Sequence, residues 1–200
     1  MSELFSIQLQ NRQQQGRDGI WLDLPTTTEQ VQAALRQIGI SSDNPQGLFI
    51  SGYFAEEEKR FAIPYNMVLA SNVDELNFLA SRLETLSTGE RAELNAALQA
   101  PQSELFSIGR ITDFPENVDY YVHLPDVHGP AQLGDYYLNR SGMVDMPEEW
   151  KGGIDTAQFG RYVAQQEQGA FTQYGYLVKS GDEWQKVHEG QPVPEEYRVL

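Results

Sequence analysis

The apolar residues of this chain change their spacing several times, and this change is the feature that most restricts its fold. Clustered or alternating apolar residues at 4–9, 20–24 and 48–54 are typical of β-strands. Between the second and third of these segments a helix is predicted over 28–38, because its apolar residues recur every three or four positions after a run of capping threonines. The order β-β-α-β predicts a small sheet covered by one helix.

The next two segments have helical spacing throughout. Ser71 or Asn72 can cap a helix whose first turn is acidic, and a second helix starts at 87–90 and ends before Pro101. Residues 71–100 are therefore predicted to form a central helical hairpin.

The second half of the chain mixes both kinds of spacing. Strands are predicted at 105–108, 118–124, 171–178 and 183–187. Helical segments are predicted from Pro130 to Gly142, at Pro147–Trp150 as a single turn, and after a cap at Asp155 or Thr156. The proline-rich residues 190–200 are expected to be loose.

The order of these elements predicts an α+β protein. Its expected domains are a sheet domain at 1–68, a helical linker at 69–101, an acidic α+β domain at 102–180 and a tail at 181–200.

One six-residue sequence occurs twice, as Ser2–Ile7 and as Ser103–Ile108, and each copy is followed by a segment that ends in Leu-Pro. The repeat is compatible with a duplicated sheet domain. It is also compatible with chance and a shared strand composition, and this second interpretation is favoured because nothing clear matches beyond the six residues.

The sequence lacks the common signatures of catalysis and cofactor binding. It contains no cysteine, and it contains no GxGxxG, GxxxxGK[ST], GxSxG or HExxH motif. His123, Asp126 and His128 share a proline-flanked segment, which is interpreted as a surface loop rather than a metal site. We therefore expect no enzyme activity, no cofactor and no metal.

Negative charge is concentrated in the second half of the chain. Asp and Glu outnumber Lys and Arg 29 to 14 overall and 10 to 3 between residues 111 and 170, and no Lys or Arg lies between Arg110 and Arg140. This charge opposes direct binding to nucleic acid or to an anionic membrane. It fits either a solvated acidic face or a series of carboxylates that imitate phosphates.

Nothing in the sequence indicates export or insertion into a membrane. No apolar run approaches the roughly 20 residues of a membrane span, and the N-terminal residues lack a signal-peptide pattern. A cytoplasmic protein is therefore expected.

Several short motifs follow one another in an order that resembles a known family. They are Gly19–Pro25, Asn72–Ala80, Gly134–Leu138, Ser141–Gly142, Met146–Glu149, Ile154–Asp155 and Phe159–Arg161. Their order and spacing are similar to those of the ArdA antirestriction proteins of conjugative plasmids and transposons. The resemblance implies an elongated homodimer of three small domains, whose carboxylates imitate the phosphates of a bent duplex. Such proteins occupy the DNA-binding groove of type I restriction–modification enzymes, mainly on the methyltransferase and specificity subunits.

The acidic stretch and the resemblance together define candidate site residues. The carboxylates expected to face the partner are Asp113, Glu116, Asp119, Asp126, Asp135, Asp145, Glu148, Glu149 and Asp155. Residues 143–156 lie near a motif that the family links to dimerisation. The resemblance therefore makes Met143, Val144, Met146 and Trp150 candidates for a dimer interface.

The chain departs from the family in its mild acid excess and in an extension over 181–200. The alternative hypothesis is therefore a protein-interaction module of a mobile element, similar in fold but directed at another basic or DNA-binding partner.

Overall fold

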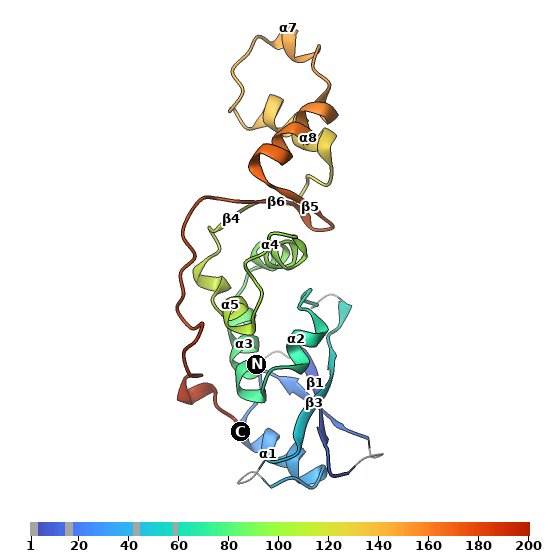
Figure 1. The fold of residues 1–200 in the computed structure, drawn as a ribbon, viewed down its shortest axis with the longest axis vertical. Helices are drawn as coiled ribbons and strands as arrows, with labels where there is room; N and C mark the ends of the chain where they lie inside the picture. Colours follow the sequence, from blue (N-terminus) through green and yellow to red (C-terminus); the bar gives the residue numbers. More distant parts are fainter. Residues whose placement is uncertain (1–3, 15–17, 42–44, 58–59) are drawn as a thin grey trace. The chain divides into compact units, whose positions relative to one another are not determined.

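The computed structural model describes residues 4–14, 18–41, 45–57 and 60–200. The chain folds into two compact units, each made of segments that are distant in the sequence (Figure 1). The first unit comprises Met1–Ser87, Leu105–Glu116 and Gln185–Leu200, and the second comprises Thr88–Glu104 and Asn117–Trp184. Each unit contains helices and an antiparallel three-stranded sheet, which confirms the predicted α+β class. The domain ranges and the elongated form stay predictions.

The sheet of the first unit has the order β2-β1-β3, with β1 (Phe5–Asn11), β2 (Ile20–Leu24) and β3 (Leu48–Phe54). Alternate residues of β1, including Ile7 and Leu9, are buried, as the period of a strand requires. Helix α1 (Thr28–Gln37) contacts β2 and begins with a capping box between Thr27 and Gln30. The predicted β-β-α-β order is confirmed.

Further helices of this unit are α2 (Tyr65–Leu69), α3 (Val73–Glu84), α5 (Ile108–Thr112) and the 3₁₀-helix η2 (Phe114–Glu116). Helix α3 begins at the predicted cap, where the Asn72 side chain accepts the backbone N–H of Glu75 and the Glu75 carboxylate accepts that of Asn72. It buries Leu76 and Leu83 at helical spacing. The second helix predicted within 71–100 is α4 (Thr88–Gln99), which belongs to the second unit.

The strand predicted at 105–108 is wrong. These residues are irregular and lead into α5. The helix begins there because the Ser107 side chain accepts a hydrogen bond from the backbone N–H of Arg110 at 3.2 Å.

The two copies of the repeated hexapeptide therefore differ in structure. After the first copy, Ile7 is followed by Leu9 at strand spacing, and the segment continues as β1. After the second copy, Ile108 is followed by Ile111 at helical spacing, and the segment continues as α5. Residues 2 and 3 of the first copy lie outside the described residues.

The expected loose tail is also wrong, because residues 185–200 pack against the first unit. The predicted strand at 183–187 does not form, so its backbone N–H groups need other acceptors. The buried side chain of Asp113 supplies one for the last residue of this range and for the two residues after it: its oxygens accept the N–H groups of Val187 (3.3 Å), His188 (2.6 Å) and Glu189 (3.2 Å).

The end of the tail has a second anchor. The Oδ1 atom of Asp74 accepts the backbone N–H groups of Val199 (2.7 Å) and Leu200 (3.0 Å), and Val199 is buried. The ring of Tyr197, in the 3₁₀-helix η4 (Glu195–Tyr197), lies 4.7 Å from the ring of Phe78 in α3. The tail is therefore an integral part of this unit.

The sheet of the second unit has the order β4-β6-β5, with β4 (Tyr121–Leu124), β5 (Ala170–Thr172) and β6 (Gly175–Lys179). The single strand predicted over 171–178 is instead a tight hairpin, because Gly175, at φ +119°, lets the chain turn. The helices are α4, α6 (Pro130–Asp135), the π-helix η3 (Tyr136–Arg140), α7 (Glu148–Lys151) and α8 (Thr156–Glu167). Among the described residues, every helix is too short or too polar to span a bilayer.

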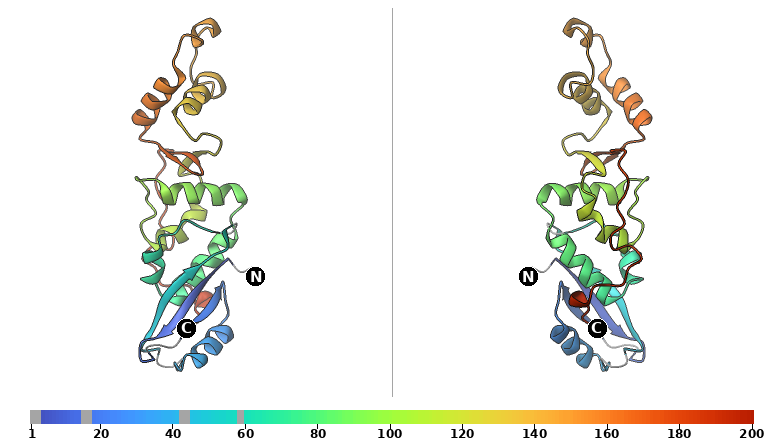
Figure 2. Two further views of the ribbon diagram at one scale, coloured as in Figure 1. Left: turned by 90° about the vertical axis from the view of Figure 1, so that its right-hand side faces the viewer. Right: turned by 90° about the vertical axis from the view of Figure 1, so that its left-hand side faces the viewer.

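Helices α6 and α8 lie side by side and approach each other very closely (Figure 2). A Cβ atom added at Gly160 would lie 1.8 Å from the carbonyl oxygen of Pro130, and one added at Gly134 would lie 1.9 Å from that of Thr156. Only glycine permits such backbone contact. The pair is completed by a buried cluster of Val127, Leu133, Ala164 and Tyr176.

The substitution Gly160→Ala should force the two helices apart. We expect it to lower the free energy of unfolding by about 2–3 kcal/mol, measured by urea denaturation, because the added methyl group overlaps backbone atoms that cannot move alone. The control is Gly89→Ala in α4, where no atom lies within 4 Å of the added Cβ, and this change should leave stability equal or raised. A Gly160→Ala protein as stable as the parent would contradict the close helix contact.

The substitution Asp113→Ala should release the tail. We expect a loss of about 3 kcal/mol in the free energy of unfolding, because three backbone donors lose a charged acceptor, together with faster amide hydrogen exchange at residues 187–189. Asp182→Ala, at an exposed position, is the control and should change stability by less than about 0.5 kcal/mol. Unchanged exchange at residues 187–189 would refute the anchoring role of Asp113.

Candidate functional site

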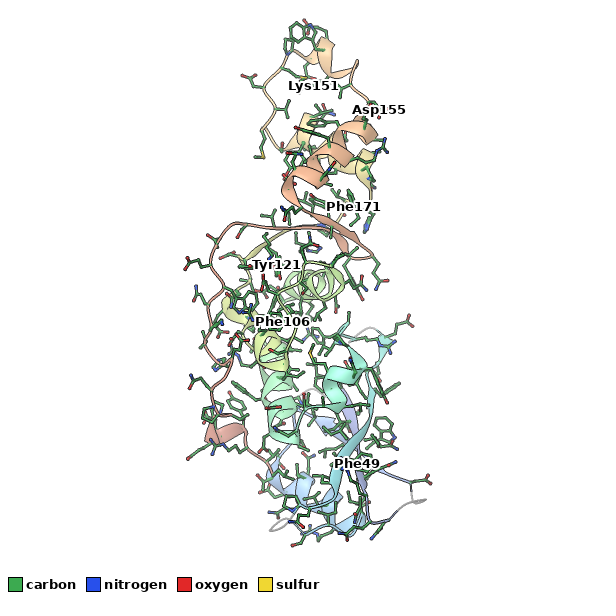
Figure 3. All side chains as sticks on the ribbon, in the orientation of Figure 1. Phe49, Phe106, Tyr121, Lys151, Asp155 and Phe171 are labelled. Atoms are coloured by element: carbon green, nitrogen blue, oxygen red, sulfur yellow. The ribbon has the colours of Figure 1, made fainter. Side chains whose placement is uncertain are left out.

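The segment 141–155, called here the 141–155 loop, connects η3 to α8 and carries α7 (Figure 1). Helix α7 buries none of its residues, and Figure 3 labels Lys151 and Asp155 along this part of the chain. Two of the predicted interface side chains are strongly exposed, Met143 at 74% and Trp150 at 68%, whereas Val144 and Met146 are half-buried. Large exposed apolar side chains within one loop are typical of an interaction surface.

The structure divides the nine predicted carboxylates into three kinds. Within the described residues, the exposed ones that make no ion pair are Asp119, Asp126, Asp145, Glu149 and Asp155. All of them belong to the second unit. The Asp155 side chain also caps α8, where it accepts the backbone N–H of Gln158 at 2.9 Å.

Three other predicted carboxylates are paired with cations. Arg140 contacts Asp135 at 2.8 Å, and Lys151 contacts Glu148 at 2.6 Å. The hydrogen bond from Asn139 and, to a smaller extent, the Arg140 guanidinium lower the pKa of Asp135. Glu116 pairs with Arg82 in the first unit. These carboxylates are partly neutralised and are weaker candidates for contact with a basic surface.

Asp113 is the clear correction among the predicted site residues. Its side chain is fully buried and holds the tail, so it cannot present a charge to a partner. Asp113, Glu116 and His188 also bring possible metal-ligating atoms within 4.8 Å of one another. Their oxygens already face backbone N–H groups and the Arg82 guanidinium, so the cluster is explained by tail anchoring.

The prediction that His123, Asp126 and His128 share one surface loop is wrong for His123, which is a half-buried residue of β4, whereas Asp126 and His128 follow the strand. The Nε2 atom of His123 lies 2.7 Å from the carbonyl oxygen of Tyr174, and it therefore helps to fix the β5–β6 turn. Asp126 and His128 are exposed.

Sequence reasoning missed a residue that joins three elements of the second unit. The carboxylate of Glu167, at the end of α8, accepts the hydroxyl of Tyr137 from η3 and the hydroxyl of Tyr176 from β6 at 2.9 Å. Burial and the hydrogen bonds to Glu167 raise the pKa of both tyrosines, so they remain neutral donors. Nothing in the sequence pointed to Glu167.

A second missed carboxylate changes the charge of the second unit. Burial, with added repulsion from Asp119 and Glu90, raises the pKa of Glu93 in α4 to about 8. Glu93 is therefore largely protonated at neutral pH, and the unit is less negative than its sequence suggests.

The family described as "Antirestriction protein (ArdA)" matches residues 15–178 of the chain. A search of curated proteins finds no match.

Proposed function

Because this chain belongs to the ArdA family of antirestriction proteins, we propose that it is an acidic mimic of duplex DNA. In this proposal it binds the DNA-binding groove formed by the methyltransferase and specificity subunits of a type I restriction–modification enzyme in the cytoplasm. Inhibition follows from occupancy, since DNA cannot enter a groove that is already filled. No catalytic step by this protein is required.

The observation that carries the proposal is the set of five exposed carboxylates between residues 119 and 155 that make no ion pair within the described residues. Asp119 and Asp126 flank β4, Asp145 and Glu149 lie in the 141–155 loop, and Asp155 begins α8. A groove that binds DNA is lined by basic side chains, because each contacted phosphate has to be neutralised. Carboxylates held on a folded framework can make the same ion pairs without the ordering cost of a flexible chain.

The framework of the second unit is suited to that role. Helix α8, which follows the 141–155 loop, is in close backbone contact with α6, and the Glu167 carboxylate at its end accepts the hydroxyls of Tyr137 and Tyr176. The loop itself carries the exposed Met143 and Trp150, which we propose as the contact between two copies of the chain. A symmetric dimer would carry a formal charge of -30, twice the -15 of one chain. A duplex of about 40 base pairs has about 80 phosphates, so the imitation is partial and depends on where the charges lie.

The test is competition with duplex DNA for a purified type I methyltransferase. The unmodified protein should displace a labelled duplex, and displacement should weaken as salt rises, because screening reduces charge complementarity. The fourfold variant Asp119→Asn, Asp126→Asn, Asp145→Asn and Glu149→Gln should compete about 30-fold less well. This corresponds to about 0.5 kcal/mol for each lost ion pair.

The matched control changes four exposed carboxylates of the C-terminal region, Asp182→Asn, Glu183→Gln, Glu195→Gln and Glu196→Gln. It alters the net charge equally and should compete like the unmodified protein. If both variants lose the same amount, total charge rather than position matters, and the proposed surface is wrong. If the unmodified protein does not compete at all but retains a defined protein partner, the interaction-module hypothesis replaces DNA mimicry.

A further inference from the structure

A cavity of about 600 Å³ opens within the first unit and is distinct from the carboxylates of the second unit. Its walls come from α2, α3, the segment that leads into α5, and the tail. The volume falls within the range of roughly 300–1,000 Å³ that is typical of ligand sites. Its apolar lining consists of Met67, Phe78, Phe106, Ile108, Pro192 and Val193.

Two aromatic rings of this lining differ in exposure. Phe78 is buried and is held by the His188 ring at 4.9 Å. Phe106, labelled in Figure 3, is 63% exposed. The guanidinium of Arg110 lies 4.6 Å from the centre of the Phe106 ring. The cavity wall therefore already holds one cation against an aromatic face.

The charged groups that line the cavity include Glu75 and Glu189. The Oε1 atom of Glu189 accepts a hydrogen bond from Nε of Arg110 at 3.1 Å. Its Oε2 atom is enclosed and has no hydrogen-bond donor in the part of the chain that the structure describes, and the Lys186 ammonium lies 3.6 Å away. Within the described residues, the Glu75 carboxylate accepts one hydrogen bond, a long one of 3.4 Å from the Asn72 N–H. It can therefore accept further donors.

We propose that this cavity accepts an arginine side chain of the protein partner. The apolar walls would cover its aliphatic stem, Phe106 would face the guanidinium plane, and Glu75 would accept its N–H groups. Arginine fits better than lysine because a planar guanidinium stacks on a ring and donates in several directions at once. The source of this arginine rests on the proposed function, since a DNA-binding groove is rich in arginine. The affinity of the cavity for an arginine side chain is independent of the proposed function.

The first experiment is an NMR titration of the full chain with N-acetyl-arginine amide, with N-acetyl-citrulline amide as the neutral isostere. We expect saturable shifts at residues 106–109 and 188–193, with a Kd of about 1 mM, which is appropriate for one side chain. The citrulline compound should bind at least about fivefold more weakly, as expected when a charge-assisted contact becomes a neutral one. Equal binding of the two compounds, or no saturable shift, would overturn the proposal.

Two variants test the lining. Glu75→Gln removes a charge but keeps the capping box, because glutamine also serves at this helix position, and Phe106→Leu removes an exposed ring with little effect on packing. Each should weaken arginine-amide binding about fivefold or more. Glu195→Gln, an exposed carboxylate of the same unit, should leave it unchanged. A similar loss in the control would show that the shifts report only general charge.

The second experiment separates the cavity from the proposed function. In the methyltransferase competition, the double variant Glu75→Gln and Phe106→Leu should displace DNA about tenfold less well than the unmodified protein. If this variant displaces DNA as well as the unmodified protein does, the proposal that an arginine of the partner occupies the cavity is wrong. If the unmodified protein binds the arginine amide but never competes with DNA, the proposed function fails while the arginine site stands.

Discussion

The first unit depends on one buried carboxylate. Asp113 follows α5, and its carboxylate accepts the backbone N–H groups of residues 187–189, which belong to no strand or helix. This contact fixes the direction of the tail, so that His188 and Tyr197 reach Phe78 and residues 188–193 form a wall of the cavity. A buried charge is stable only where its oxygens are fully hydrogen-bonded. Here the N–H groups of the tail supply that bonding, and the same hydrogen bonds fix the conformation of the tail.

Charge in this protein depends on context more than on composition. Asp113 serves the fold, Asp135 and Glu148 are paired with neighbouring cations, and burial suppresses ionisation of Glu93. Of the nine carboxylates predicted to face a partner, the five that are exposed and unpaired within the described residues flank β4, lie in the 141–155 loop or begin α8. The set of candidate charges is therefore smaller than the sequence alone suggests.

Local signals predicted the elements that local interactions determine. Asn72 and Asp155 begin helices because their side chains accept N–H groups a few residues away. The strand predicted at 105–108 failed because the same six residues continue differently in their two contexts. The roles of Asp113 and Glu167 could not be predicted, since their partners lie 74 and 30 residues away in the sequence. The exposure of the carboxylates at 119–155 could be predicted from the sequence, because acidic residues without nearby basic partners tend to remain in solvent.

Helix α7, which buries none of its residues, has a consequence for evolution. Substitutions at buried positions of a fold are constrained because they cost stability. Positions on α7 are free of that constraint, so Glu149 and Trp150 can be exchanged while the helices and sheet of the same unit keep their packing. The sequence of the 141–155 loop can therefore vary around α7 with little loss of stability.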